Sequence, residues 1–289
     1  MISRAALAVG ATVALAMSGC APVSGPADTA LPSGISISVY QTPTDVAERR
    51  LEVAVRNDTE RVLTITGLVF DSPQFAAPVR WVKDSTRIRP GTEVDLPVLL
   101  ADASCTDERP VATVTLDYSL EGAQSGTAVT QPVDRIDRLP ELELEDCIAV
   151  DVAAIAEITP PAALRFGTAA GVELALIDLA VAPTGAGGSL LIDSVLSTTL
   201  LEVADPGVGA GLDELPLDLT VDSDDADSVL TVAMLPGRCD PHSIAEDKRG
   251  TIVPLSVIVD GVSGILYLTT ADAVRAELYA FVKRVCGLP

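Results

Sequence analysis

The feature that most constrains the fold of this 289-residue chain is a repeat that divides it into two similar halves. When Ser125-Gly126 is aligned with Ser263-Gly264, the next cysteine follows at nearly the same distance in both halves. A preceding cysteine, and before it an apolar run typical of a β-strand, also recur in each half, at residues 94–100 and 229–235. Because self-similarity on this scale indicates a duplicated structural unit, the chain is predicted to form two related domains.

Four cysteines belong to this repeat, and four cysteines permit three pairings. Their equivalent positions favour one of these, in which Cys105 pairs with Cys147 and Cys239 pairs with Cys286. Each disulfide would then lie within one half of the chain. A linkage between the halves would contradict both the pairing and the division into two domains.

Several short segments alternate apolar and polar residues with a period of two, as expected for strands with one buried face. Residues 35–40 and 51–56 show this pattern in the first half, and residues 112–120 have a counterpart at 253–259 in the second half. Turn-forming residues separate the runs at short intervals. The predicted fold class is therefore mainly β, with one β-sandwich in each half.

This architecture resembles tandem bacterial immunoglobulin-like domains over residues 34–289. A boundary is predicted near Pro160-Pro161, since paired prolines disfavour regular structure, so the first domain spans 34–157 and the second 158–289. The antibody pattern of two cysteines bracketing a core tryptophan is absent, because the single tryptophan, Trp81, precedes Cys105. The resemblance therefore implies an architecture and no binding residues.

One segment departs from the β pattern, because residues 271–285 carry apolar side chains at helical spacing. Val274, Leu278, Phe281 and Val285 would form one face, so the second domain is expected to end in a helix that Cys286 staples to the sandwich. The matching segment of the first half, 133–147, contains Pro140, which predicts that any helix there is short.

The N-terminus has the features of an export signal. Arg4 precedes an apolar stretch, residues 5–17, that is too short to span a membrane. It leads to Ser18-Gly19-Cys20, which resembles the lipobox of bacterial lipoproteins. The resemblance implies that residues 1–19 are a cleaved signal peptide and that Cys20 is acylated and becomes the mature N-terminus. Residues 20–33 then form a flexible tether at the extracytoplasmic face of the cell membrane.

The charge of the chain constrains its partners. The formal net charge is −22, and basic residues occur in no run longer than pairs such as Arg49-Arg50, which argues against binding to nucleic acid. Membrane contact is therefore expected to come from the lipid on Cys20, while the acidic body is repelled by anionic headgroups.

The only histidine, His242, follows Cys239 and lies near Asp240 and Asp247, which could orient it or join it at a metal. A disulfide would remove Cys239 as a ligand, and no second histidine exists. The favoured interpretation is a polar loop anchored by the disulfide. A functional site at His242 is the alternative.

A second acidic cluster, Asp222–Asp227, begins like a calcium loop. The pattern then fails, because Ala226 and Asp227 stand where such a loop needs an acid and a glycine. An acidic turn between strands is the favoured interpretation, and calcium bound in another geometry is the alternative. We expect no cofactor and no metal.

Together these features predict a lipid-anchored binding or structural module of the bacterial cell envelope that is not an enzyme. Its partner would be an envelope protein or a wall component, and the sequence nominates no functional residue other than Cys20. The alternative is an envelope enzyme or a solute-binding lipoprotein, with a site between the domains or around His242.

Overall fold

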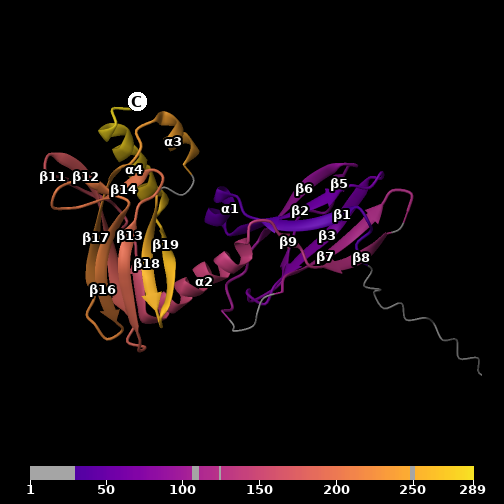
Figure 1. The fold of residues 1–289 in the computed structure, drawn as a ribbon, viewed down its shortest axis with the longest axis horizontal. Helices are drawn as coiled ribbons and strands as arrows, with labels where there is room; N and C mark the ends of the chain where they lie inside the picture. The colour runs from indigo at the N-terminus through magenta and orange to yellow at the C-terminus, as the bar shows by residue number, and fades with distance from the viewer. Residues whose placement is uncertain (1–29, 106–110, 124, 248–250) are drawn as a thin grey trace, which may run out of the picture.

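The computed structural model describes residues 30–105, 111–123, 125–247 and 251–289. Within these ranges the chain forms two β-sandwich units that are joined by one long helix (Figure 1). The prediction of a mainly β protein with two tandem immunoglobulin-like sandwiches and a C-terminal helix is confirmed. None of the helices in the described ranges is long and apolar enough to cross a bilayer.

The first unit has two facing sheets, with strand orders β6-β2-β1-β9 and β4-β3-β7-β8, and β5 pairs with β3. Short β9 runs parallel to β1, whereas β2 is antiparallel to both β1 and β6. The elements are β1 (Ile35–Tyr40), α1 (Pro43–Glu48), β2 (Arg50–Asn57), β3 (Leu63–Asp71), β4 (Val79–Arg80), β5 (Thr86–Ile88), β6 (Thr92–Leu99), β7 (Thr113–Leu120), β8 (Ser125–Thr130) and β9 (Val133–Asp134).

The second unit also has two sheets, with orders β10-β12-β17-β14-β15 and β16-β13-β18-β19, and β11 pairs with β12. It follows the joining helix α2 (Arg138–Ile155). Its elements are β10 (Ala156–Thr159), β11 (Arg165–Ala169), β12 (Val172–Pro183), β13 (Ser189–Leu196), β14 (Leu201–Ala204), β15 (Gly211–Leu212), β16 (Glu214–Asp222), β17 (Ser228–Pro236), α3 (Pro241–Glu246), β18 (Ile252–Val259), β19 (Val262–Thr269) and α4 (Asp272–Val285).

The strand pairing reproduces the repeat that the sequence indicated. β6 pairs with β2 in the first unit as β17 pairs with β12 in the second. β7 lies between β3 and β8 as β18 lies between β13 and β19. The aligned Ser125-Gly126 and Ser263-Gly264 lie at the beginning of the equivalent strands β8 and β19. The duplicated unit is thus a sandwich followed by a helix.

Both predicted disulfides are present. Cys105, in the connection after β6, bonds to Cys147 in α2, and Cys239, in the connection after β17, bonds to Cys286 at the end of α4. The Cα atoms of the two pairs are 5.4 and 5.2 Å apart. Each disulfide therefore ties a loop at one end of a sandwich to the helix that follows that sandwich.

Helix α2 corrects the expectation of a short helix, since it has 18 residues. Pro140 is its third residue, where the missing N–H has no partner within the helix in any case, so the ring is tolerated. The side chain of Asp134 caps this end, because its carboxylate accepts hydrogen bonds from the backbone N–H groups of Arg138 (2.9 Å) and Leu139 (2.7 Å). A proline in a first turn does not limit the length of the helix that follows.

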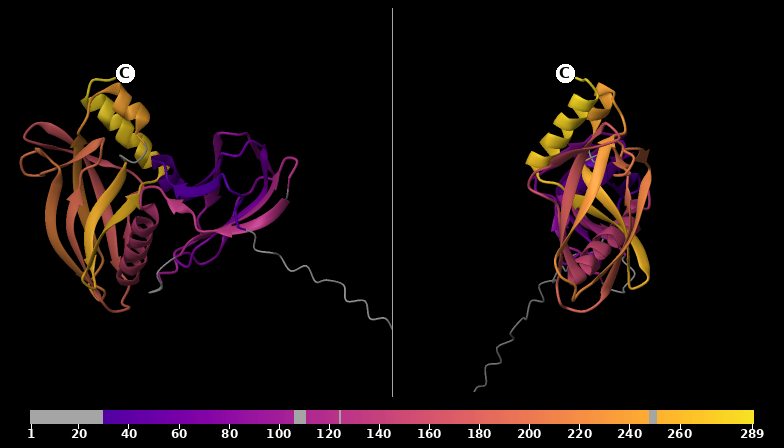
Figure 2. Two further views of the ribbon diagram at one scale, coloured as in Figure 1. Left: turned by 45° about the vertical axis from the view of Figure 1, so that its right-hand side comes forward. Right: turned by 90° about the vertical axis from the view of Figure 1, so that its left-hand side faces the viewer.

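Helix α2 contributes to the cores of both units. Leu142 packs in the first core, whereas Ile148, Val152 and Ile155 pack in the second. The change from one core to the other therefore lies inside the helix, before the boundary that the proline pair suggested. Figure 2 shows the second half of α2 along the side of the second sandwich, where it contacts the edge strands β10 and β19.

Gly264 in β19 accommodates this helix. A Cβ atom at Gly264 would lie 2.5 Å from Cγ1 of Ile148, which is closer than the two carbons can approach. The strand thus accepts α2 because a side chain is missing there. Helix α4 covers a different part of the second unit, near the C-terminus (Figure 2). Val282, rather than the expected Val285, completes its buried stripe, and Val285 is 38% exposed.

Candidate functional site: a groove at the junction of the two units

The residue to which the sequence assigned lipidation, Cys20, lies outside the described residues, as do the signal peptide 1–19 and most of the tether.

His242 lies in the short helix α3, beside the Cys239 disulfide. Neighbouring acids take part in local contacts: Asp240 pairs with Arg238 at 3.3 Å, and Asp247 accepts a hydrogen bond of 2.9 Å from Tyr279 Oη. Burial and this hydrogen bond raise the pKa of Tyr279 to about 12. The disulfide and these local contacts hold the acids on both sides of His242.

The acidic cluster Asp222–Asp227 forms the turn between β16 and β17. The backbone N–H of Asp225 donates to the carbonyl of Asp222 at 3.0 Å, and the Asp225 carboxylate accepts from the Asp222 N–H at 2.9 Å. One carboxylate thus closes the turn. Neither this cluster nor the surroundings of His242 brings together three metal-ligating side chains within the described ranges.

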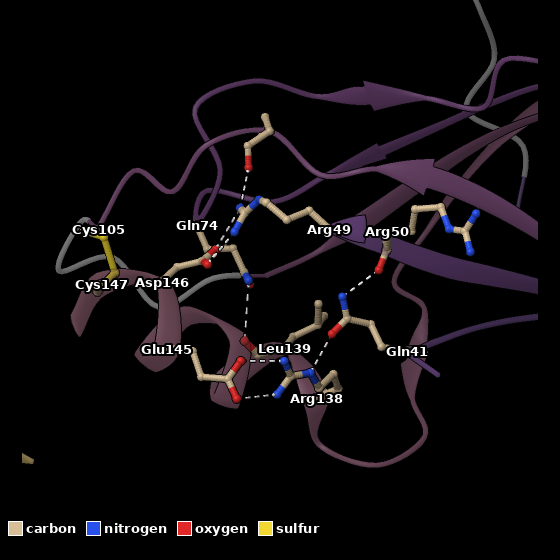
Figure 3. A network of polar contacts seen from close by, with 11 residues as sticks. Gln41, Arg49, Arg50, Gln74, Cys105, Arg138, Leu139, Glu145, Asp146 and Cys147 are labelled. Atoms are coloured by element: carbon tan, nitrogen blue, oxygen red, sulfur yellow. Dashed lines mark hydrogen bonds and ion pairs between the residues drawn. A yellow bond between two sulfur atoms is a disulfide. The ribbon is translucent and has the colours of Figure 1, made fainter. Parts of the chain in front are cut away.

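A polar network fastens the first half of α2 to the first unit (Figure 3). Arg49, which follows α1, donates to both carboxylate oxygens of Asp146 at 2.7 and 3.1 Å, and to the carbonyl of Ala101 at 3.0 Å. The hydrogen bonds to Asp146 raise the pKa of Arg49, so the guanidinium stays charged. A bidentate pair of this kind fixes orientation as well as distance. Asp146 precedes Cys147, so the ion pair and the disulfide act on adjacent residues of the helix.

The second part of the network centres on Arg138, which is 6% exposed. Its guanidinium donates to the two carboxylate oxygens of Glu145 at 3.1 and 2.6 Å and to the side-chain carbonyl of Gln41 at 2.7 Å. Gln41 in turn donates to the backbone carbonyl of Arg50 at 2.6 Å. A buried charge needs partners of this kind, and here they hold the first turns of α2 against the end of β1.

A groove begins where this network faces the second unit. Its first part, which we call the junction lobe, has a volume of about 300 Å³ and is lined by both units and by α2. Its lining residues are Gln41, Val46, Arg49, Leu142, Glu145, Asp146, Ala149, Ile252, Tyr267 and Thr269.

The second part, the sheet lobe, has a volume of about 500 Å³ and shares Ile252 and Tyr267 with the junction lobe. It lies on the outer face of β18 and β19, beside the loop that follows β13. Its lining residues are Leu196, Ser197, Thr198, Thr199, Asp213, Ile252, Pro254, Ile265 and Tyr267. Because the two lobes share residues, we treat them as one feature and call it the junction groove.

The floor of the junction groove is apolar on a face where alternation predicts polar residues. Val253 and Leu255 point into the sandwich core, so Ile252 and Pro254 point outward, and Pro254 lies opposite Tyr267 in the neighbouring strand. The sequence reasoning identified the inward residues of this strand and missed the outward ones. The available signal was the almost unbroken apolar run 252–259, which is typical of a strand covered on both faces.

The loop that borders the sheet lobe is held by its own hydrogen bonds. Ser197 Oγ donates to the carbonyl of Leu212 at 2.6 Å and accepts from the N–H of Val203 at 2.8 Å. Thr198 Oγ1 accepts from the N–H of Leu201 at 3.0 Å. The hydroxyl groups therefore shape the rim, and Asp213 brings a carboxylate to it. The groove combines apolar surface with acidic groups, which suits recognition of a ligand.

No protein-family model matches the chain, and no curated protein matches it. Among solved structures it is similar to red sea bream transglutaminase, with 10% identity and a TM-score of 0.22 over 83% of this chain and 32% of that one. The chain thus spans about a third of that enzyme. It is also similar to the YadV chaperone (10% identity, 81% and 100% coverage, TM-score 0.22) and to Spo0M, a sporulation control protein from Bacillus subtilis (12% identity, 88% and 98% coverage, TM-score 0.22). Similarity at this level adds nothing about function.

Proposed function

We propose that this chain is a lipid-anchored, extracytoplasmic binding or structural module of the bacterial cell envelope, without catalytic activity. The observation that carries the proposal is the junction groove, which has an apolar floor and is lined by both units and by α2. Outward-facing apolar residues grouped on a sheet are typical of interaction surfaces. The Arg49–Asp146 pair and the Cys105–Cys147 disulfide fix α2 beside it, which supports a preformed site.

The anchor in this proposal is the acylated Cys20, with residues 21–33 as the tether to the first unit. A multiply acylated cysteine provides stable membrane attachment, whereas one chain gives only marginal binding. The net charge of −22 would keep the two units away from anionic headgroups and leave the groove open to the periplasmic or extracellular side.

Replacement of Cys20 tests the anchor. We expect Cys20→Ser to move the protein from the membrane fraction to the medium, or to block its processing, while the matched variant Ser24→Ala stays in the membrane fraction. Mass spectrometry of the mature wild-type protein checks the same point. A wild-type N-terminus other than an acylated Cys20 would contradict the proposal.

A second candidate, a solute-binding lipoprotein or envelope enzyme, is favoured by one observation: the junction lobe lies between the two units. A broad screen for turnover by the wild-type protein separates the candidates. The His242→Ala variant then locates any site, because His242 does not line the junction lobe and only a site around His242 should lose its turnover. Turnover that is lost in this variant, while the melting curve stays unchanged, would replace the binding function with an enzymatic one.

A further inference from the structure

We infer that the junction groove recognises an extended segment of a partner protein in which aliphatic side chains stand next to lysine or arginine. The inference rests on the proposed binding function and names the chemistry of the partner. It is carried by the shape of the groove, by the polarity of its floor and by the charge of its rim.

The shape favours a segment over a single compact group. The two lobes, of about 500 and 300 Å³, share the lining residues Ile252 and Tyr267 and therefore lie next to each other. Each lobe has a volume within or near the usual range for a ligand pocket, about 300–1,000 Å³. A segment in extended conformation projects alternate side chains to one side, so two side chains of the same face can enter the two lobes.

The apolar lining of the groove, on its floor and its walls, selects aliphatic side chains. Ile265 and Pro254 line the sheet lobe, and Val46 and Leu142 line the junction lobe. Burial of apolar surface is the main source of affinity that such a lining can offer.

The rim selects a cation. In the junction lobe each acid already has a basic partner, because Asp146 pairs with Arg49 and Glu145 pairs with Arg138. In the sheet lobe Asp213 is exposed, and no cation in the described part of the chain pairs with its carboxylate. The formal net charge of −22 also favours the approach of basic segments, because an acidic protein attracts them over long distances.

Two capped pentapeptides test this inference with the intact mature protein. Leucine, valine and leucine alternate with two lysines in one probe and with two glutamates in the other. We expect the lysine probe to shift backbone NMR signals of residues 252–269 and to bind at least tenfold more tightly than the glutamate probe at low salt. The preference should shrink as salt screens the charges.

Matched variants locate the contacts. We expect Asp213→Asn to weaken binding of the lysine probe about threefold, as for a solvent-exposed ion pair, while Asp218→Asn, another exposed acid of this unit, changes nothing. Ile265→Ala should weaken binding of the lysine probe, whereas Ile258→Ala, which removes the same atoms from the same sheet face outside the groove lining, should not.

The inference is wrong if neither probe binds at millimolar concentration, if both bind equally, or if Asp213→Asn and Ile265→Ala leave binding unchanged. The proposed function fails separately. A protein that is anchored through Cys20 and captures an envelope partner unaffected by Ile265→Ala would keep the binding function and place its site elsewhere.

Discussion

The two helices that follow the two sandwiches occupy equivalent places in the repeat but have different roles. Both α2 and α4 come after the last strands of a unit, and both are tied by a disulfide to the connection before β7 or before β18. Helix α4 returns to its own unit, where Val274, Leu278 and Phe281 are completely buried. Helix α2 leaves its unit and completes the side of the next one.

The difference explains why one helix is evident in the sequence and the other is not. The buried residues of α4 form a single stripe, because all of them face one core. In α2, Leu142 and Ile148 are six residues apart, which at about 100° per residue places them on faces roughly 120° from each other. A helix shared between two cores has two short apolar faces in succession and so shows no single stripe.

Truncation of buried side chains gives the largest expected effects and tests the division of α2 between two cores. We expect Phe281→Ala to lower the free energy of unfolding of the second unit by about 3–5 kcal/mol and Ile148→Ala to lower it by about 2–4 kcal/mol. Leu142→Ala, in the same helix as Ile148, should instead destabilise the first unit by about 2–4 kcal/mol.

The single tryptophan makes this measurable, because Trp81 is buried in the core of the first unit. Its fluorescence during denaturation by urea should shift with Leu142→Ala and not with Ile148→Ala or Phe281→Ala. Circular dichroism follows both units together. Equal shifts of the Trp81 transition in all three variants would show that the helix does not separate two cores.

The two disulfides close loops of similar length, with separations of 42 and 47 residues, so chain entropy alone gives each about 4 kcal/mol. We expect loss of about 2–4 kcal/mol when either pair is replaced by serine. Their effects on shape should differ. Removal of Cys105–Cys147 should broaden the distribution of distances between the units in X-ray scattering, whereas removal of Cys239–Cys286 should not.

That broadening should be modest, because Arg49–Asp146 and Arg138–Glu145 still hold α2 against the first unit. Adding Arg49→Ala to the variant that lacks Cys105–Cys147 should increase the broadening. A scattering curve unchanged by both alterations would mean that α2 needs neither contact to keep its place, and that packing of Leu142 is sufficient.

The sequence predicts those parts of this fold that depend on local pattern or on the repeat. Alternation identifies β1, β2, β7 and β18, and the equivalent positions of the cysteines identify both disulfides. Pro140 misled the prediction for α2, because the effect of a proline depends on its position in the helix, which the side chain of Asp134 sets from outside. Asp134 lies outside the helix, so the sequence of the helix alone does not show at which residue the helix begins.

The junction groove could not be predicted by the same reasoning. Its floor comes from the outward residues of β18 and β19, and its walls from α1, α2 and the loop after β13. A period of two tells which residues share a face, but it does not tell which face is inside when both are apolar. The run 252–259 is ambiguous for this reason. Its outward face becomes evident only when α2 is placed beside β19.

The smallest expected effect compares one tyrosine in each unit at alkaline pH. Burial, together with a hydrogen bond to Asp95, raises the pKa of Tyr40 to about 12, and burial with a hydrogen bond to Asp247 raises the pKa of Tyr279 to about 12. Both folded values exceed the ordinary value of 10.0, so the unfolded chain loses these protons first. The stabilisation is complete below pH 10 and is lost as the pH rises through 12.

We expect Tyr40→Phe to reduce the alkaline loss of stability of the first unit, followed by Trp81, and Tyr279→Phe to reduce that of the second. Absorbance of tyrosinate near pH 12 should decrease by one group in each variant. Because Tyr40 lies on the outer face of a sheet and Tyr279 on the helix α4, the two substitutions should act independently. If either substitution changed the alkaline transition of the other unit, α2 would transmit strain between the sandwiches as well as join them.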